Sequence, residues 1–92
     1  MDLDPNFPFA LYVSGNLYTQ AGRLAEAVGE FQRAVVSSGR TPKYLFMLAN
    51  AYLEMGKRSE ASKLLEELRE QAKIGYVPPD YIGSLAGKLR PS

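Results

Sequence analysis

The sequence predicts an all-α protein in which five helices form stacked helix-turn-helix repeats. Three observations lead to this prediction. The two halves of the chain are related by a fixed interval, apolar residues within each half recur at helical spacing, and a glycine follows the first helix of each half. Repeats of this kind are usually supersecondary units that stack to bury a continuous core.

The interval is 34 residues, as between Tyr18 and Tyr52. Because one register is kept across many positions, the chain contains an internal repeat. The same interval relates six further identical pairs: Pro8 and Pro42, Leu11 and Leu45, Asn16 and Asn50, Gly22 and Gly56, Glu26 and Glu60, and Ala27 and Ala61.

Apolar residues recur at the spacing of a helix face in each segment of the repeat. Gly22 and Gly56 come just after the first helix of each unit, where a left-handed residue ends a helix at little cost. A final helix should begin near Pro79, because proline suits a first turn and Asp80 favours the positive end of the helix dipole. The predicted helices cover residues 8–21, 24–37, 42–55 and 58–73, with the fifth starting near Pro79.

The residues at fixed positions of both units resemble the tetratricopeptide repeat family. That family places apolar, small, tyrosine and glycine residues at set positions of a 34-residue unit. The resemblance implies a right-handed α-α superhelix and a role in binding other proteins. The residues that carry it are Leu11, Gly15, Tyr18, Gly22, Ala27, Phe31 and Ala34 in the first unit, and Leu45, Ala49, Tyr52, Gly56, Ala61, Leu65 and Leu68 in the second.

The register of the resemblance predicts a single domain over residues 1–92 that is a segment of a longer array. The alternative is a small stand-alone protein. Ile82, Leu85 and Leu89 should cover the apolar side of the helix over 58–73, because a terminal unit needs an outer face that water tolerates. The expected parts are residues 1–7 as the tail of a preceding repeat, 8–41 and 42–75 as two full repeats, and 76–92 as a partial third repeat that forms a capping helix.

Composition argues against catalysis and against several classes of partner. The chain has neither Cys nor His, which removes the usual zinc ligands, cysteine nucleophiles and the commonest general base. The net charge is +1, so no electrostatic case exists for nucleic acid, and no apolar stretch is long enough for a membrane span. We therefore expect no enzyme activity, cofactor or metal, and a cytoplasmic location.

A second stripe of residues lies on the first helix of each unit, away from the core positions. In the tetratricopeptide repeat family these positions line the concave groove that takes extended peptides, so the resemblance implies a peptide-binding role. The alternative is that both asparagines bond within the array and that the aromatic rings pack on adjacent helices. The stripe consists of Phe9, Tyr12, Asn16 and Thr19, and of Lys43, Phe46, Asn50 and Leu53 one unit later.

Two functions follow as hypotheses. The first is a non-enzymatic protein–protein interaction scaffold that binds a peptide or helix of another protein in the groove. The second is a structural module that self-associates through the edges of its units, as in a homodimer, or that spaces domains in a larger protein. Short arrays leave their end helices partly bare, and this favours self-association as the alternative.

Overall fold

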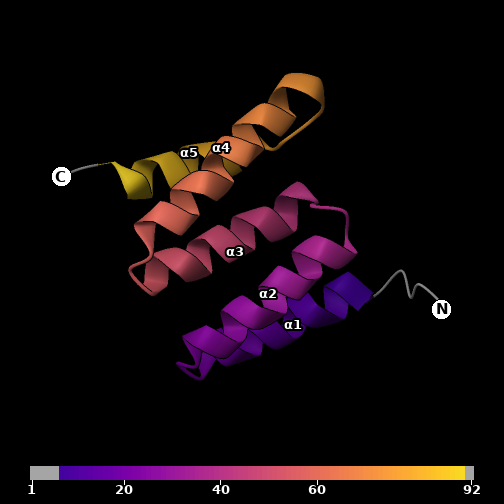
Figure 1. Ribbon diagram of the computed structural model, residues 1–92, viewed down its shortest axis with the longest axis vertical. Coiled ribbons are helices and arrows are strands. Elements are labelled where there is room, and N and C mark those ends of the chain that lie inside the picture. The colour runs from indigo at the N-terminus through magenta and orange to yellow at the C-terminus, as the bar shows by residue number, and fades with distance from the viewer. Residues whose placement is uncertain (1–6, 91–92) are drawn as a thin grey trace.

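The computed structural model describes residues 7–90 as five helices (Figure 1). Within these residues there is no strand, and the all-α fold is confirmed. Both ends of the first four helices and the start of the fifth lie within one residue of their predicted positions. The expected tail at residues 1–7 lies outside the described residues except for Phe7, which begins the first helix. The helices are α1 (Phe7–Gln20), α2 (Leu24–Ser37), α3 (Pro42–Glu54), α4 (Arg58–Ile74) and α5 (Pro79–Leu89).

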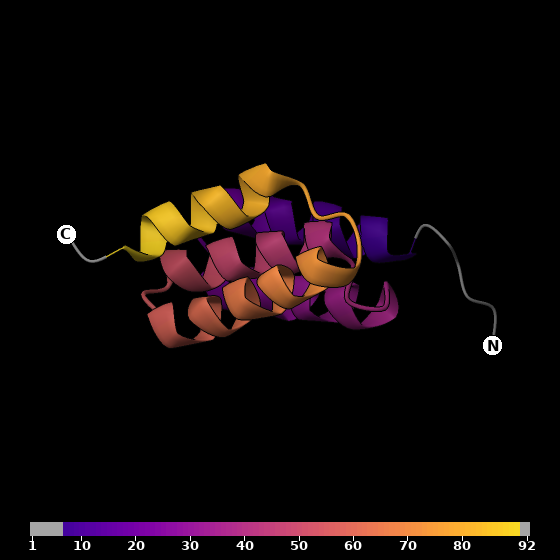
Figure 2. The same cartoon turned by 90° about the horizontal axis from the view of Figure 1, so that it is seen from above.

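The helices form two layers in a flat molecule with extents of 43 × 34 × 18 Å. Seen from above, α1, α3 and α5 lie in one layer and α2 and α4 in the other (Figure 2). Helix α3 packs against α2, α4 and α5, whereas the main contact of α1 is with α2. Among residues 7–90, the middle helix is therefore enclosed, whereas the first helix is covered extensively by α2 alone.

The turns inside the two repeats have the same backbone geometry. Gly22 and Gly56 both have φ of 78°, the left-handed region that glycine adopts without a side-chain penalty. In each turn the following residue donates its backbone N–H to the repeat tyrosine: Arg23 to the carbonyl of Tyr18 and Lys57 to that of Tyr52, both at 2.8 Å. These bonds satisfy carbonyls at the helix end and fix the angle at which the second helix returns.

A close approach between α1 and α2 depends on Gly15. A Cβ atom placed on Gly15 would lie 2.5 Å from the ring of Phe31, which is 2% exposed. In the second repeat the corresponding pair is Ala49 and Leu65, both buried. The larger residue on one helix is thus matched by the smaller residue on the other, so both helix pairs pack without a gap.

Helix α5 closes the C-terminal end of the stack. Leu85 is fully buried, and Ile82 and Leu89 pack against the core, as expected, but the helix contacts α3 as well as α4. The guanidinium of Arg58 donates to the carbonyls of Lys88 at 3.3 Å and Leu89 at 2.6 Å, which lack partners inside the helix. A cation at this end also interacts favourably with the helix dipole.

Candidate interaction surface

An aromatic cluster joins α1 to α3 at the edge of the layer that α1, α3 and α5 share. The ring centroids of Phe9 and Tyr12 are 5.8 Å apart, and those of Tyr12 and Tyr44 are 6.1 Å apart in an edge-on arrangement. The ammonium of Lys43 lies 4.5 Å from the centroid of Tyr12 and 5.8 Å from that of Phe9. These distances are within the range of cation–π attraction. The structure therefore brings together three residues of the predicted stripe that come from different repeats.

Several members of this cluster remain accessible. Phe9 is 52% exposed, and Tyr12, Lys43 and Tyr44 are half-buried. Within residues 7–90 the ammonium of Lys43 has no carboxylate within ion-pair distance. We call Phe9, Tyr12, Lys43 and Tyr44 the aromatic–lysine cluster. It combines exposed apolar area with a positive charge whose position is fixed by the rings beneath it.

The two asparagines of the stripe have different surroundings. The amide of Asn50 donates to the backbone carbonyl of Phe46 at 3.1 Å and accepts from the ammonium of Lys88 at 2.5 Å. Asn16 is half-buried and forms no side-chain hydrogen bond with any residue from 7 to 90. Asn50 thus bonds within the array, as in the alternative stated above, while the amide of Asn16 has no side-chain hydrogen-bond partner among the described residues.

The rest of the stripe packs within the protein. Phe46 stacks on Tyr81 of α5, with centroids 4.4 Å apart and the rings 13° from parallel. The hydroxyl of Thr19 donates to the carbonyl of Gly15 at 2.8 Å, and Leu53 is half-buried against the core. Phe46 and Asn50 therefore join α3 to α5, and Thr19 satisfies a carbonyl of its own helix.

Sequence reasoning did not assign Tyr44, Tyr81 or Lys88 to this surface. Tyr44 could have been found, because it follows the stripe residue Lys43 and adds a further aromatic ring next to Tyr12 in the stacked repeats. Lys88 and Tyr81 could not, since their contacts depend on how α5 crosses α3. The 34-residue interval gives no information about the angle at which α5 crosses α3.

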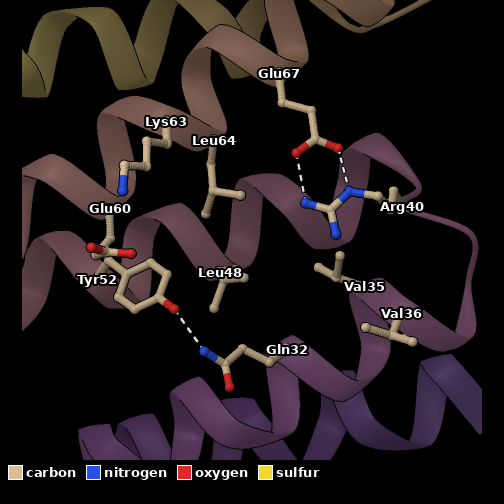
Figure 3. Close-up of a pocket in the computed structure, with 10 residues that line it drawn as sticks. All are labelled: Gln32, Val35, Val36, Arg40, Leu48, Tyr52, Glu60, Lys63, Leu64 and Glu67. Atoms are coloured by element: carbon tan, nitrogen blue, oxygen red, sulfur yellow. Dashed lines mark hydrogen bonds and ion pairs between the residues drawn. The ribbon is translucent and has the colours of Figure 1, made fainter.

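The opposite layer carries a groove of about 460 Å³ between α2 and α4, with α3 as its floor (Figure 3). Val35, Leu48 and Leu64 supply its apolar base. At one end the guanidinium of Arg40 donates to both carboxylate oxygens of Glu67, the Nη2 bond being 2.6 Å. The hydrogen bond to Glu67, more than its charge, holds the pKa of Arg40 above its ordinary value.

The Arg40 pair has a structural role. Arg40 has φ of 62°, an unusual backbone conformation for a residue with a side chain. Its carbonyl accepts from the amide of Gln71 at 2.9 Å, so two side chains of α4 hold the turn that leads from α2 to α3. Gln32 and Tyr52 form a further bond across the groove, at 2.7 Å. Four polar residues that line the groove, Gln32, Arg40, Tyr52 and Glu67, are thus engaged in contacts between repeats.

Residues 42–68, which span α3 and most of α4, match the tetratricopeptide repeat family. The chain therefore contains a tetratricopeptide-type helical repeat, as the resemblance predicted. Repeats of this family are a scaffold fold that generally mediates interactions between proteins. Neither the comparison with curated proteins nor the comparison with solved structures gave a match.

The described residues offer neither a membrane-spanning helix nor a cluster of metal ligands. Between residues 7 and 90 no helix is both long and apolar enough to cross a membrane. Over the same residues, no group of three or more His, Cys, Asp or Glu side chains is placed to hold a metal ion.

Proposed function

We propose that this protein is a non-enzymatic interaction module that acts in the cytoplasm and binds an extended peptide or a helix of another protein. The ligand lies on the layer of α1, α3 and α5 and contacts the aromatic–lysine cluster first. Asn16 follows one helical turn after Tyr12, so a ligand lying along α1 reaches both residues. In this proposal both repeats contribute to one binding surface.

The observation that supports this proposal most directly is the position of Lys43 over two rings. Tyrosine and phenylalanine supply large contact areas with few rotatable bonds, and a charge held in place loses little further freedom when a ligand binds. A cation–π contact of this kind contributes about 0.5–1 kcal/mol at an exposed site. The cluster is therefore ordered before the ligand arrives, which favours affinity.

Asn16 gives the face a group that can bond to a peptide backbone. Its amide has both donors and an acceptor, and no residue from 7 to 90 uses them. Asn50 keeps one amide hydrogen and one lone pair free after its bonds to Phe46 and Lys88, so its contribution is smaller. Phe46, Thr19 and Leu53 form the outer contacts in this proposal.

The test begins with peptides selected from a display library against the full chain, with affinity measured by fluorescence anisotropy. Asn16→Ala should weaken binding about 2- to 10-fold, which corresponds to about 0.5–1.5 kcal/mol for one hydrogen bond. Tyr12→Ala should weaken it by about 10-fold or more, because buried tyrosines are common hot spots. Asn16→Ala should leave the melting temperature within about 2 °C, since its amide holds no other part of the fold together.

The matched control is Val36→Ala, a truncation of a residue on α2 that is 73% exposed in the other layer. Its affinity should equal that of the unaltered chain. The proposal fails if no peptide is selected. It fails equally if binding survives Tyr12→Ala and is lost in Val36→Ala, because the ligand would then occupy the groove between α2 and α4.

A further inference from the structure

Positive charge is concentrated at the start of α3, where Lys43 directly follows Pro42. The first turns of α2, α4 and α5 each contain an acidic residue, Glu26, Glu60 and Asp80, which interacts favourably with the positive end of the helix dipole. The first turn of α3 contains no acidic residue and carries a lysine instead. The ammonium of Lys43 and the positive end of α3 therefore act together at one place on the layer of α1, α3 and α5.

The carboxylates of this layer do not neutralise that charge. Within residues 7–90 Lys43 has no carboxylate within ion-pair distance, and α1 contains no acidic residue. Glu54 ends α3, about 16 Å along the helix axis from Lys43 at 1.5 Å per residue. Asp80 lies at the positive end of its own helix. An anion from outside these residues is therefore the complementary group for Lys43.

The rings under Lys43 make this charge more effective than that of an ordinary surface lysine. A free lysine loses much side-chain freedom when it forms an ion pair, which is why most exposed pairs contribute little. The ammonium of Lys43 already lies 4.5 Å from the centroid of Tyr12 and 5.8 Å from that of Phe9. It has three N–H donors, and a ring face is a weaker partner for them than a carboxylate. Less ordering remains to be done when a carboxylate binds.

We infer that the ligand of this surface carries an acidic side chain, Asp or Glu, that pairs with Lys43, and an apolar side chain that packs on Phe9. This inference rests on the proposed function and names the chemistry of its ligand. Along α1, Tyr12 lies between Phe9 and Asn16, and Lys43 lies over Tyr12. A ligand that reaches both Phe9 and Asn16 continues on either side of Lys43, so the carboxylate belongs to a side chain and not to a chain end.

The geometry also limits the spacing of the two ligand residues. The ammonium of Lys43 is 5.8 Å from the ring centroid of Phe9. In an extended peptide, side chains two positions apart lie on the same side and about 6.5–7 Å apart. On a helix, side chains three or four positions apart lie about 5–6 Å apart. The apolar and acidic residues should therefore be two positions apart in an extended ligand, and three or four apart in a helical one.

The experiment starts from peptides selected from a random display library against the full chain. They are synthesised with amidated C-termini, so that side-chain carboxylates are the anions measured. Among peptides that require Tyr12, as judged by Tyr12→Ala, an acidic residue at one of these spacings from an apolar residue should be enriched. Replacing that residue by its amide, Glu by Gln or Asp by Asn, should weaken binding about 3- to 10-fold in fluorescence anisotropy.

Variants of the chain assign this preference to Lys43. Lys43→Met removes the charge and keeps a flexible apolar side chain for the same rings. It should weaken the acidic peptide about 3- to 10-fold and change the amide peptide by less than about 2-fold, so the two changes are coupled. Lys43→Arg keeps the charge and the contact with the rings, and should retain the preference. The matched control is Lys63→Met, which removes the same charge from the groove of the other layer and should alter neither affinity.

Salt dependence gives a second readout if Lys43→Met alters the fold. With the unaltered chain, rising ionic strength should weaken the acidic peptide more than the amide peptide. Equal affinities for the two peptides overturn this inference and leave the proposed function standing, and so does a loss that is as large in Lys63→Met as in Lys43→Met. A library that yields no peptide requiring Tyr12 contradicts the proposed function itself, and this inference with it.

Discussion

Helices α1 and α3 occupy the same place in their repeats, yet their surroundings differ. Helix α3 packs against α2, α4 and α5. It therefore has four buried residues, Leu45, Leu48, Ala49 and Ala51. In α1 the buried residues are Leu11 and Gly15, since only α2 covers it extensively. The comparison teaches that the repeat pattern specifies which residues can be buried, while the number of neighbours decides which of them are.

The largest expected effect comes from introducing Asp at the same repeat position of α1 and of α3, which is Leu17 in α1 and Ala51 in α3. Ala51→Asp should cost about 3 kcal/mol or more, because a charge would enter a site that is 3% exposed. Leu17→Asp should change the stability of the monomer by less than about 0.5 kcal/mol, since Leu17 is 61% exposed. Thermal melting followed by circular dichroism measures both. Similar melting temperatures for the two variants would mean that α1 and α3 are equally covered in solution.

The next effect concerns the matched residues between paired helices. Gly15→Ala should destabilise the protein by about 1–3 kcal/mol, because the new methyl group overlaps the ring of Phe31. Adding Phe31→Leu should restore much of this loss, since the pair then equals Ala49 and Leu65 of the second repeat. Urea denaturation of the single and double variants gives the coupling energy directly.

Gly29→Ala is the control for that series. Gly29 also lies inside a helix, but a Cβ atom there meets no atom within 4 Å. The substitution should therefore stabilise α2 by up to about 1 kcal/mol through helix propensity. A loss of stability in Gly29→Ala comparable to that of Gly15→Ala would contradict the role assigned to the Phe31 ring.

A smaller effect separates the two asparagines. Asn50→Ala removes the bonds to Phe46 and Lys88 and should cost about 0.5–1.5 kcal/mol, or roughly 2–12 °C in melting temperature. Asn16→Ala should cost close to nothing. Differential scanning calorimetry of the two variants measures the difference, and equal losses would show that the amide of Asn16 also bonds within the fold.

The smallest expected effect is that of the ion pair between repeats. Glu67→Gln should lower stability by about 0.5–1 kcal/mol, because Arg40 and Glu67 are partly exposed and solvent weakens their attraction. The repeat equivalent of Glu67 is Arg33, which pairs with Glu30 of its own helix. Arg33→Gln should therefore have a weaker effect on the unfolding free energy in urea. The reverse order would mean that the Arg40 turn is not held by α4.

The sequence alone determined the five helices and their order. Tyr18, Gly22 and their equivalents Tyr52 and Gly56 identified where each helix pair turns, because apolar spacing and glycine conformation are local properties of the chain. The same interval predicted that Tyr12 and Lys43 would lie on one layer, and the structure places Lys43 over the ring of Tyr12. Sequence patterns are sufficient for these predictions because stacking repeats the same helix–helix contacts in each unit.

Only the tertiary structure decided which of these residues are available to a ligand. Asn16 and Asn50 occupy equivalent positions of the two repeats. Helix α5 crosses α3 and brings Lys88 to Asn50, whereas no helix within residues 7–90 brings a hydrogen-bonding side chain to Asn16. Leu17 and Ala51 likewise differ because α3 has a helix pair before it in the chain and α1 has none among the described residues. Exposure depends on which helix packs next, and that is a property of the assembled stack.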